Sequence, residues 1–565
     1  MSTLRRTLLL VLLATGALAN PILHPRQLPW PDPVPASSIG PLDWSSIPPS
    51  LYFPPHSSSK LKVAASASLP ATVDWRNRTN LNYITTPQDQ GQCNSCWAFA
   101  TTALIESMIR IEHGVWSKRS EADVHDMAGA ACESVGNAEE TLAWVAGMGA
   151  DWVTDPSKLP PGVADWPCDP YKATVHGYEH CWDRRGRATF IPFYRAMGEV
   201  EDQKRYGDAN IDAWTKYGLS NVNPDPWTRK RHQSGSMLQS GNGETHRNFE
   251  LLISERSTGF SHVSRDGDSS KWSKVADIQG SILGQPAILG TSFNRDLHVV
   301  GVDKDKTLRQ WEYSQTGKKW SEISTIQGKD IDGFPGVTQG DGSGLVMVVK
   351  HSDGTLNEYQ QTPNSTTWTL TNSPIASSIA QSGPSLVQSN INLDIYNLQS
   401  ASRGNLYTVA VRSDGKLQLF WRPGQDKATW STGEVFGEEI PLNTPLVMIQ
   451  DYFNTVDETS VGGFQLLVAV NGNVQHWERI NDDIGTKAPV EGNQGKWKLK
   501  ETVGAGVKHV WALVQGSFRQ KMHMITEGTD GSMSYWEWNG NWAVVEKLPA
   551  LNDRGWANSE PVTGG

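Results

Sequence analysis

The chain has 565 residues, of which 19% are charged and 24 are Trp, and its formal net charge is −10. The length suits two or three domains, and the composition excludes a coiled coil and a wholly disordered chain. The acidic balance gives no support to nucleic-acid binding or to attraction by an anionic membrane. The excess of Trp over the 13 Phe and 13 Tyr is typical of a Trp-bearing repeat.

The first 19 residues have the features of a secretory signal peptide. Arg5 and Arg6 precede an apolar stretch that ends at Ala19, and cleavage is expected before Asn20. This stretch is too short to span a bilayer, and no later apolar run approaches ~20 residues. We therefore expect no membrane span and a secreted protein, or one delivered to a vacuolar or lysosomal lumen. N-glycosylation sequons at Asn77 and Asn364 fit that route.

Residues 20–68 are Pro-rich, with eleven prolines between Pro21 and Pro55. Such a composition favours extended chain without a core. The segment is interpreted as a propeptide or a linker.

Residues 69–222 contain all five cysteines, and an odd count in a secreted protein leaves one free thiol. The strongest helical pattern runs from about Ser95 to Glu112, with Gly114 as its stop. Its apolar residues at helical spacing are Phe99, Ala103, Met108 and Ile111.

The sequence QGQCNSCWAF at residues 90–99 resembles the nucleophile motif of papain-family cysteine peptidases. The upstream LPATVDWR at residues 69–76 resembles the mature N-terminus of that family, and the likeness continues weakly to about residue 218, with WPCDPY at residues 166–171. The resemblance implies an α+β papain-like fold. Only the helical half of that fold is recognisable in this chain.

The resemblance implies that Cys96 is the nucleophile and that Gln90 donates to the oxyanion. Cys96 lies at the start of the predicted helix, where the helix dipole stabilises a thiolate that can attack a peptide carbonyl. The resemblance also implies a Cys93–Cys132 disulfide, which leaves Cys168 to pair with Cys181. Cys96 is then the free thiol, although a buried structural role for it is the alternative.

The histidine and asparagine of papain-like catalysis have no recognisable sequence context here. His232 lies 136 residues after Cys96, a spacing that fits, but no apolar strand follows it. His298 lies in a stretch that matches a repeated strand, and Asn539 lies in Trp538-Asn539-Gly540, a sequence typical of a turn. No histidine or asparagine is therefore assigned. The basic run Arg229–Arg231 is interpreted as a solvated loop or a processing site.

From residue 236 to about residue 560 the sequence predicts an all-β propeller of six blades. Turns such as Asp414-Gly415 and Asn471-Gly472 separate pairs of apolar strands, which is a strong hairpin signal. An aromatic residue follows most turns at a fixed offset, and the weakest copy, after Gly259, has Ser264 there. A later Trp marks every copy: Trp272, Trp320, Trp368, Trp430, Trp497 and Trp542. One blade cannot bury both faces, whereas a closed ring of blades can.

The repeat resembles Trp-rich lectin-type propellers, which implies glycan binding only by analogy of fold. Residues 223–235 are interpreted as a linker. We expect a secreted cysteine peptidase that hydrolyses peptide bonds, with a propeller that binds substrate or glycan, and with no cofactor and no metal site. The alternative is an inactive peptidase remnant that functions in binding. A third interpretation is that the sequence across residues 219–235 has lost an intervening segment that carried the histidine and asparagine.

Overall fold

The computed structural model describes residues 74–76, 82–127, 132, 141, 142, 145, 162–171, 181, 184–189 and 229–548, the last range with gaps in its loops. The predicted signal peptide at residues 1–19 and the Pro-rich segment at residues 20–68 lie outside the described residues, as do Asn77 and Asn364. The chain divides into two compact units, Met1–Pro224 and Asp225–Gly565.

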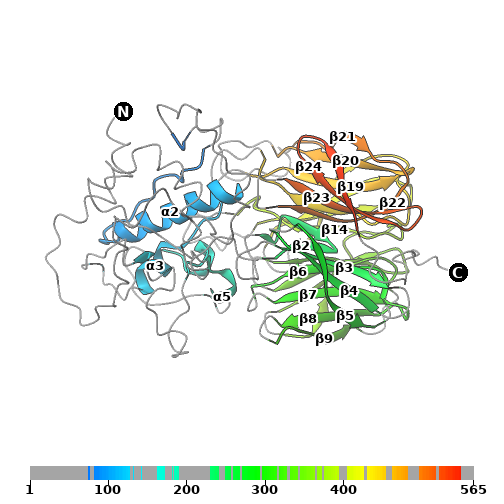
Figure 1. Ribbon diagram of the computed structural model, residues 1–565, viewed down its shortest axis with the longest axis horizontal. Helices are drawn as coiled ribbons and strands as arrows, with labels where there is room; N and C mark the ends of the chain where they lie inside the picture. Colours follow the sequence, from blue (N-terminus) through cyan, green and yellow to red (C-terminus); the bar gives the residue numbers. More distant parts are fainter. Residues whose placement is uncertain are drawn as a thin grey trace. The chain divides into compact units, whose positions relative to one another are not determined.

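The first unit contributes the helices drawn in blue and cyan in Figure 1. They are α2 (Cys96–His113), α3 (Glu121–Met127), the 3-10 turn η5 (Trp166–Cys168) and α5 (Arg184–Arg187). No helix among the residues that the structure describes has the length and apolar character needed to cross a membrane.

Helix α2 closely follows its predicted range. It begins after Ser95 and ends at Gly114, whose φ of 69° lets its N–H donate to Arg110 O at 2.9 Å. Glycine adopts this left-handed conformation at little cost because it has no Cβ. Trp97, Ile105 and Ile109 are buried, whereas most of the predicted apolar positions are only half-buried. The helix is therefore packed on more than one side.

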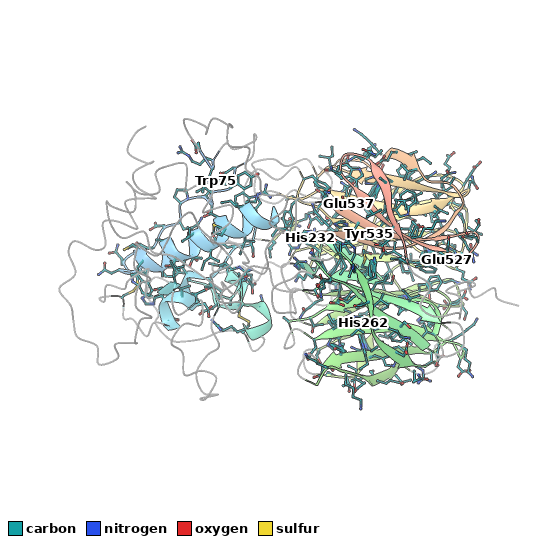
Figure 2. The ribbon with its side chains drawn as sticks, in the orientation of Figure 1. Trp75, His232, His262, Glu527, Tyr535 and Glu537 are labelled. Atoms are coloured by element: carbon teal, nitrogen blue, oxygen red, sulfur yellow. A yellow bond between two sulfur atoms is a disulfide. The ribbon has the colours of Figure 1, made fainter. Side chains whose placement is uncertain are left out.

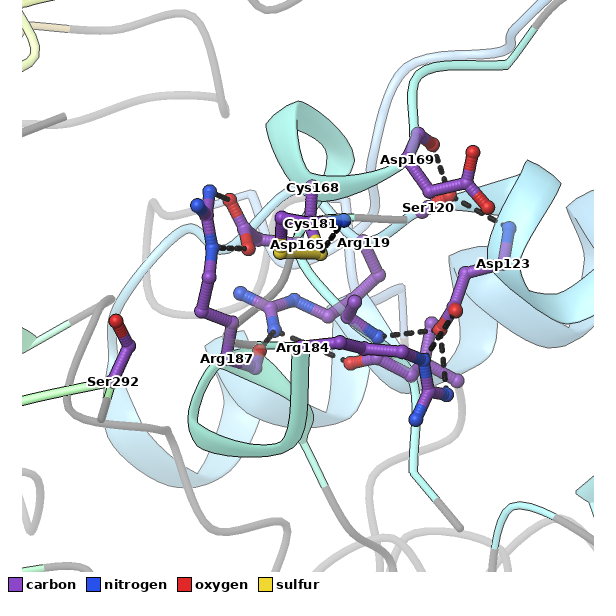
Figure 3. Close-up of a disulfide and its surroundings, with 12 residues drawn as sticks. Arg119, Ser120, Asp123, Asp165, Cys168, Asp169, Cys181, Arg184, Arg187 and Ser292 are labelled. Atoms are coloured by element: carbon purple, nitrogen blue, oxygen red, sulfur yellow. Dashed lines mark hydrogen bonds and ion pairs between the residues drawn. A yellow bond between two sulfur atoms is a disulfide. The ribbon is translucent and has the colours of Figure 1, made fainter. Parts of the chain in front are cut away.

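Two buried Arg–Asp pairs hold the short helices of the first unit together (Figure 3). Arg184 on α5 binds Asp123 on α3 through contacts of 2.5 and 2.9 Å, and Arg187 binds Asp165, which precedes η5, through two contacts of 2.6 Å. Each pair is bidentate, a geometry in which the guanidinium matches both carboxylate oxygens. The pairs fix α3, η5 and α5 around the disulfide between Cys168 and Cys181.

The second unit consists of six antiparallel sheets, which form the six blades of a propeller. The first three blades are β2 (Met237–Gln239), β3 (Phe249–Glu255), β4 (Gly259–Arg265) and β5 (Trp272–Gln279); β6 (Ile282–Gly290), β7 (Leu297–Asp303), β8 (Leu308–Ser314) and β9 (Lys319–Ile326); and β10 (Gly336–Gln339), β11 (Leu345–Lys350), β12 (Leu356–Gln361) and β13 (Trp368–Leu370). The fourth and fifth are β14 (Ser385–Gln388), β15 (Leu406–Val411), β16 (Leu417–Arg422) and β17 (Ser431–Phe436); and β18 (Val447–Gln450), β19 (Phe464–Val470), β20 (Asn473–Arg479) and β21 (Lys498–Val503). The sixth is β22 (Val507–Gln515), β23 (Met522–Gly528), β24 (Met533–Trp538) and β25 (Trp542–Lys547), with β1 (Gln233–Gly235) added beside β22.

Apolar clusters between neighbouring blades close the ring. Leu252 of the first blade packs in one cluster with Val299 of the second, and Phe249 of the first blade packs in another with Tyr535 of the sixth. The fold class predicted for this region, an all-β propeller with six blades, is thus confirmed.

The register of the first blade differs from the sequence alignment. In the second blade Trp311 lies opposite Val299, and in the first blade the residue at the same position, opposite Leu251, is Val263 rather than Ser264. The alignment was one residue out because Gly259 is the first residue of β4 and not part of the turn.

The predicted linker also ends earlier than expected. Residues Gln233–Gly235 form β1 and pair with β22. Arg229, Lys230 and Arg231 are buried, with exposed fractions of 7%, 3% and 7%, so the interpretation of this run as a solvated loop is wrong. The run is buried by strands more than 200 residues away in sequence, so the residues around it could not predict its burial.

Four of the repeat Trp side chains fasten one blade to the blade before it. The indole N–H of Trp368 donates to Gln310 at 2.8 Å, and that of Trp430 donates to Glu358 at 2.6 Å. Trp320 and Trp542 donate in the same way to His262 and His476. The acceptor occupies one register position on the third strand of the preceding blade, so the Trp repeat is a blade-to-blade connection.

Candidate active site

Cys96 is the first residue of α2, and its thiol is free and exposed. The other four cysteines form the disulfides Cys93–Cys132 and Cys168–Cys181, the pairs that the papain resemblance implies. A thiol at a helix N-terminus lies where the helix dipole and the first backbone N–H groups favour negative charge. The first turn of α2 contains no acidic residue to oppose this effect.

The loop before α2 is fixed by contacts to its own backbone and to Cys132. The N–H of Asn94 donates to Cys132 O at 2.9 Å, and the side-chain amide of Gln90 donates to Cys93 O at 2.8 Å. A primary amide nitrogen carries two hydrogens, so this contact leaves the second hydrogen of Gln90 for another acceptor.

Tyr171 supports this loop, and the sequence did not single out its role. Its hydroxyl donates to Gln90 O at 2.8 Å and lies 2.7 Å from Ser95 Oγ. A phenol has only one hydrogen, so Ser95 Oγ donates to Tyr171. Ser95 therefore does not cap α2 with its side chain, and the helix N-terminus beside Cys96 stays uncapped. The WPCDPY segment was the available signal for this residue.

A buried charged cluster links α2 to α3. Glu106 on α2 accepts from the N–H of Arg119 at 2.7 Å and from Lys118 Nζ at 3.1 Å, and Lys118 also binds Glu121 on α3. Burial raises the pKa of Glu106 to about 7, although Lys118 opposes this shift. Burial lowers the pKa of Lys118, but Glu106 and Glu121 outweigh it and the pKa ends above its usual value. The cluster positions the helix that carries Cys96.

No described histidine of the first unit contacts Cys96. His125 on α3 is buried, stacks on Trp97 with a centroid distance of 5.6 Å, and has its Nε2 3.7 Å from Cys93 Sγ. His232 and His298 both lie in the propeller unit, where His232 Nδ1 donates to Gln450 O at 2.6 Å and His298 Nδ1 accepts from Gln310 at 3.1 Å.

Burial lowers the pKa of His232 well below its usual value and lowers that of His298 to about 4. Asn539 lies in the turn between β24 and β25, and its N–H donates to Asn541 O. His232, His298 and Asn539 are thus all parts of the propeller unit. The described residues also contain no group of three or more His, Cys, Asp or Glu side chains arranged to bind a metal ion.

Residues 69–216 match the family model described as "Papain family cysteine protease". The chain is 41% identical over 68 residues to "Probable cysteine protease RDL4" of Arabidopsis thaliana, covering 12% of this chain and 18% of that protein. It is 33% identical over 120 residues to "Senescence-specific cysteine protease SAG39" of Oryza sativa subsp. indica, covering 20% and 33%. It is 40% identical over 62 residues to "Ananain" of Ananas comosus, covering 11% and 17%. The chain thus spans no more than a third of the length of these curated relatives.

Among solved structures, the SapL1 lectin in complex with alpha methyl fucoside has a TM-score of 0.41 and 13% identity, covering 58% of this chain and 99% of that chain. The six-bladed lectin of Aleuria aurantia has a TM-score of 0.38 and 12% identity, covering 57% and 96%. The propeller assignment rests on the six sheets themselves. Residues 69–216 form a papain-family cysteine protease domain, and the same chain contains a six-bladed propeller.

Proposed function

We propose that the chain is a cysteine peptidase in which the Cys96 thiolate attacks a peptide carbonyl, the peptide C–N bond breaks, the leaving amine takes up a proton, and an acyl-enzyme forms. The observation that carries this proposal is the free, exposed Cys96 at the N-terminus of an 18-residue helix, in a chain whose other cysteines are paired. The developing oxyanion would accept from the backbone N–H of Cys96 and from the second amide hydrogen of Gln90. Water then hydrolyses the thioester and restores the thiol.

The loop contacts of Tyr171 serve this chemistry by positioning Gln90. The backbone carbonyl of Gln90 accepts from Tyr171, and its side-chain amide donates to Cys93 O. The Gln90 side chain therefore has little freedom before substrate binds. Preorganised donors lower the reorganisation needed when charge develops in the transition state. Tyr171 is therefore a positioning residue in this proposal.

The test combines labelling and turnover on the purified full chain. A peptidyl epoxide should label Cys96 under reducing conditions, and Cys96→Ala should lose both the label and peptide hydrolysis. Gln90→Ala should keep the label but lose roughly 100-fold or more in kcat, the scale of one oxyanion donor. Absence of labelling in the wild-type protein would overturn the peptidase proposal.

The alternative function is binding by the propeller, with the first unit catalytically inactive. The resemblance implies that the thiol proton passes to a histidine, and the sequence offers no recognisable context for that histidine, which supports this alternative. Labelling of Cys96 without any hydrolysis of peptide substrates would favour it, and turnover by homogeneous protein would exclude it.

One junction of the propeller favours a ligand that bears hydroxyl groups, such as a glycan. At the junction of the sixth and first blades, the residue in the usual acceptor position is Tyr535, whose hydroxyl already bonds to His523 Nδ1 at 2.7 Å. The buried indole N–H of Trp272 and the buried Nε of Arg265 have no hydrogen-bond partner there, so a ligand that uses them has to open this junction. Both side chains pack on Tyr535, with Arg265 4.9 Å and Trp272 5.7 Å from its ring centroid.

Aromatic faces beside unused donors suit the apolar face and the hydroxyl groups of a sugar. The test is a glycan array with the full chain, repeated with Trp272→Phe, which keeps most of the packing and removes only the N–H. Loss of a bound glycan in Trp272→Phe is expected. An array without hits would remove the glycan proposal and leave the peptidase proposal untouched.

We further propose that the protein is secreted after removal of residues 1–19 and carries glycans at Asn77 and Asn364. The features that support this are the signal sequence and the two sequons. Mass spectrometry of protein from a culture medium should find Asn20 at the N-terminus of the product, or a later residue if the Pro-rich segment is also removed. Retention of Arg5 and Arg6 in the exported protein would contradict it.

A further inference from the structure

The segment Arg229–Gly235 lies at the centre of the propeller ring. Its strand β1 contacts β2, β6, β10, β14, β18 and β22, which are the innermost strands of all six blades. Innermost strands surround the axis of a propeller, so a strand that contacts all six occupies the central channel. The channel therefore contains a piece of this chain.

Hydrogen bonds fasten this segment to the fifth and sixth blades. On the fifth blade, Gln450 donates its N–H to Arg231 O at 2.8 Å, and Gln450 O accepts from His232 Nδ1 at 2.6 Å. On the sixth blade, Gln515 donates its N–H to His232 O at 2.9 Å. These bonds pair backbone groups and the His232 Nδ1 of the segment with the inner strands in a buried place, where an unpaired group would be costly. Figure 2 labels His232 within the propeller unit.

The chain then turns at Gly235 into the first blade. Gly235 has a φ of 83°, and a Cβ at this position would lie 2.0 Å from Trp511 O of the sixth blade. The next residue, Ser236, donates its N–H to the same Trp511 O at 2.9 Å and accepts from Leu252 of the first blade at 2.9 Å. Only glycine fits this turn, which joins the sixth blade to the first at the point where the ring closes.

We propose that Arg229–Gly235 is a latch that closes the propeller ring, and that its basic run is a proteolytic cleavage site concealed by the fold. The sequence Arg229-Lys230-Arg231 has the basic residues that trypsin-like peptidases require. In the folded protein these residues are at most 7% exposed. A peptidase needs an extended, accessible segment, so cleavage requires the latch to leave the channel. Cleavage at these residues therefore measures how often the segment leaves the channel.

The test is limited trypsin digestion of the full chain, with mass spectrometry to follow cleavage after Arg229, Lys230 and Arg231. When opening and closing are faster than cleavage, the cleavage rate follows the population of the open form. The wild-type protein should resist at these three bonds. Gly235→Ala should be cut at least roughly tenfold faster, because its Cβ collides with Trp511 O.

Gly540→Ala is the matched control. Gly540 has a similar φ of 89°, but a Cβ there meets nothing within 4 Å, so this variant carries the backbone strain without the collision. It should be as resistant as the wild-type protein at residues 229–231. If Gly235→Ala does not fold while Gly540→Ala does, the need for the latch in ring closure is supported.

Ser234→Ala then tests the concealed site in a folded protein. Ser234 Oγ accepts from the N–H of Met448 at 3.2 Å, and its loss should accelerate cleavage several-fold. Rapid cutting of the folded wild-type protein at these bonds would overturn the proposal. Equal resistance of folded Gly235→Ala and wild type would overturn it as well.

Discussion

Mild acid should destabilise the propeller, because it buries histidines in their neutral form. Burial lowers the pKa of His298 and of His509 to about 4 and that of His523 to about 3, with Lys508 adding to the shift of His509 and Arg265 to that of His523. In the unfolded chain each pKa returns to about 6.5. The unfolded chain therefore binds more protons than the folded one below about pH 6.5, and this stability is lost as the pH falls.

The magnitude follows from the difference between folded and unfolded pKa values. At about pH 5 an unfolded histidine is almost fully protonated and a folded one is almost fully neutral, which costs about 2 kcal/mol per group. The three groups together lose about 6 kcal/mol. Glu312 opposes them, because burial and Asp296 raise its pKa to about 7 and acid relieves the cost of its charge by about 1–2 kcal/mol. The net effect of these four groups is a loss of about 4 kcal/mol, which is a large part of a typical domain stability.

Urea unfolding of the full chain, followed by Trp fluorescence at about pH 7, 6 and 5, measures this loss for the propeller transition. His509→Phe is the informative variant, since neither ring nitrogen of His509 has a hydrogen-bond partner and its removal breaks no such contact. Between about pH 7 and 5 this variant should lose about 2 kcal/mol less than the wild-type protein. Equal losses in the two proteins, or no loss in either, would refute the reasoning.

The structure supports three further predictions. Trp368→Phe loses both ring packing and the bond to Gln310, whereas Trp497→Phe loses packing alone because the indole N–H of Trp497 has no acceptor, so Trp368→Phe should destabilise the propeller by about 1 kcal/mol more; denaturant unfolding compares them. Arg184→Ala should destabilise the first unit by about 3–5 kcal/mol, since it leaves Asp123 buried without its partner, and a thermal shift of a few degrees or less would contradict this. Tyr171→Phe should slow epoxide labelling of Cys96 several-fold by releasing Ser95, the residue before Cys96, and an unchanged labelling rate at unchanged stability would show that Tyr171 does not position this loop.

The features that local sequence encodes were predictable. Helix α2 and its end at Gly114 follow from apolar spacing and a left-handed glycine, and the blades follow from tight turns and a Trp at each repeat. The buried Arg229–Arg231 run was not predictable, because basic residues are normally solvated and its partner Gln450 is more than 200 residues away. The same holds for the candidate site. Cys96 was predictable because it lies in a continuous motif, whereas Tyr171, which contacts Ser95 beside it, lies 75 residues after Cys96 in the chain.

The Trp connections have a consequence for how such a propeller can change over time. Each connection joins a donor in one repeat to an acceptor in the repeat before it, so a blade copied or exchanged as a whole would bring a donor without its matching acceptor. The fourth and fifth blades have such a mismatch: Leu419 occupies the acceptor position, and the indole N–H of Trp497 is left buried and unpaired. Pairs such as Gln310 with Trp368 and Glu358 with Trp430 must instead change together. A chimaera that exchanges a Trp donor together with its acceptor in the preceding blade should therefore fold better than one that exchanges whole repeats.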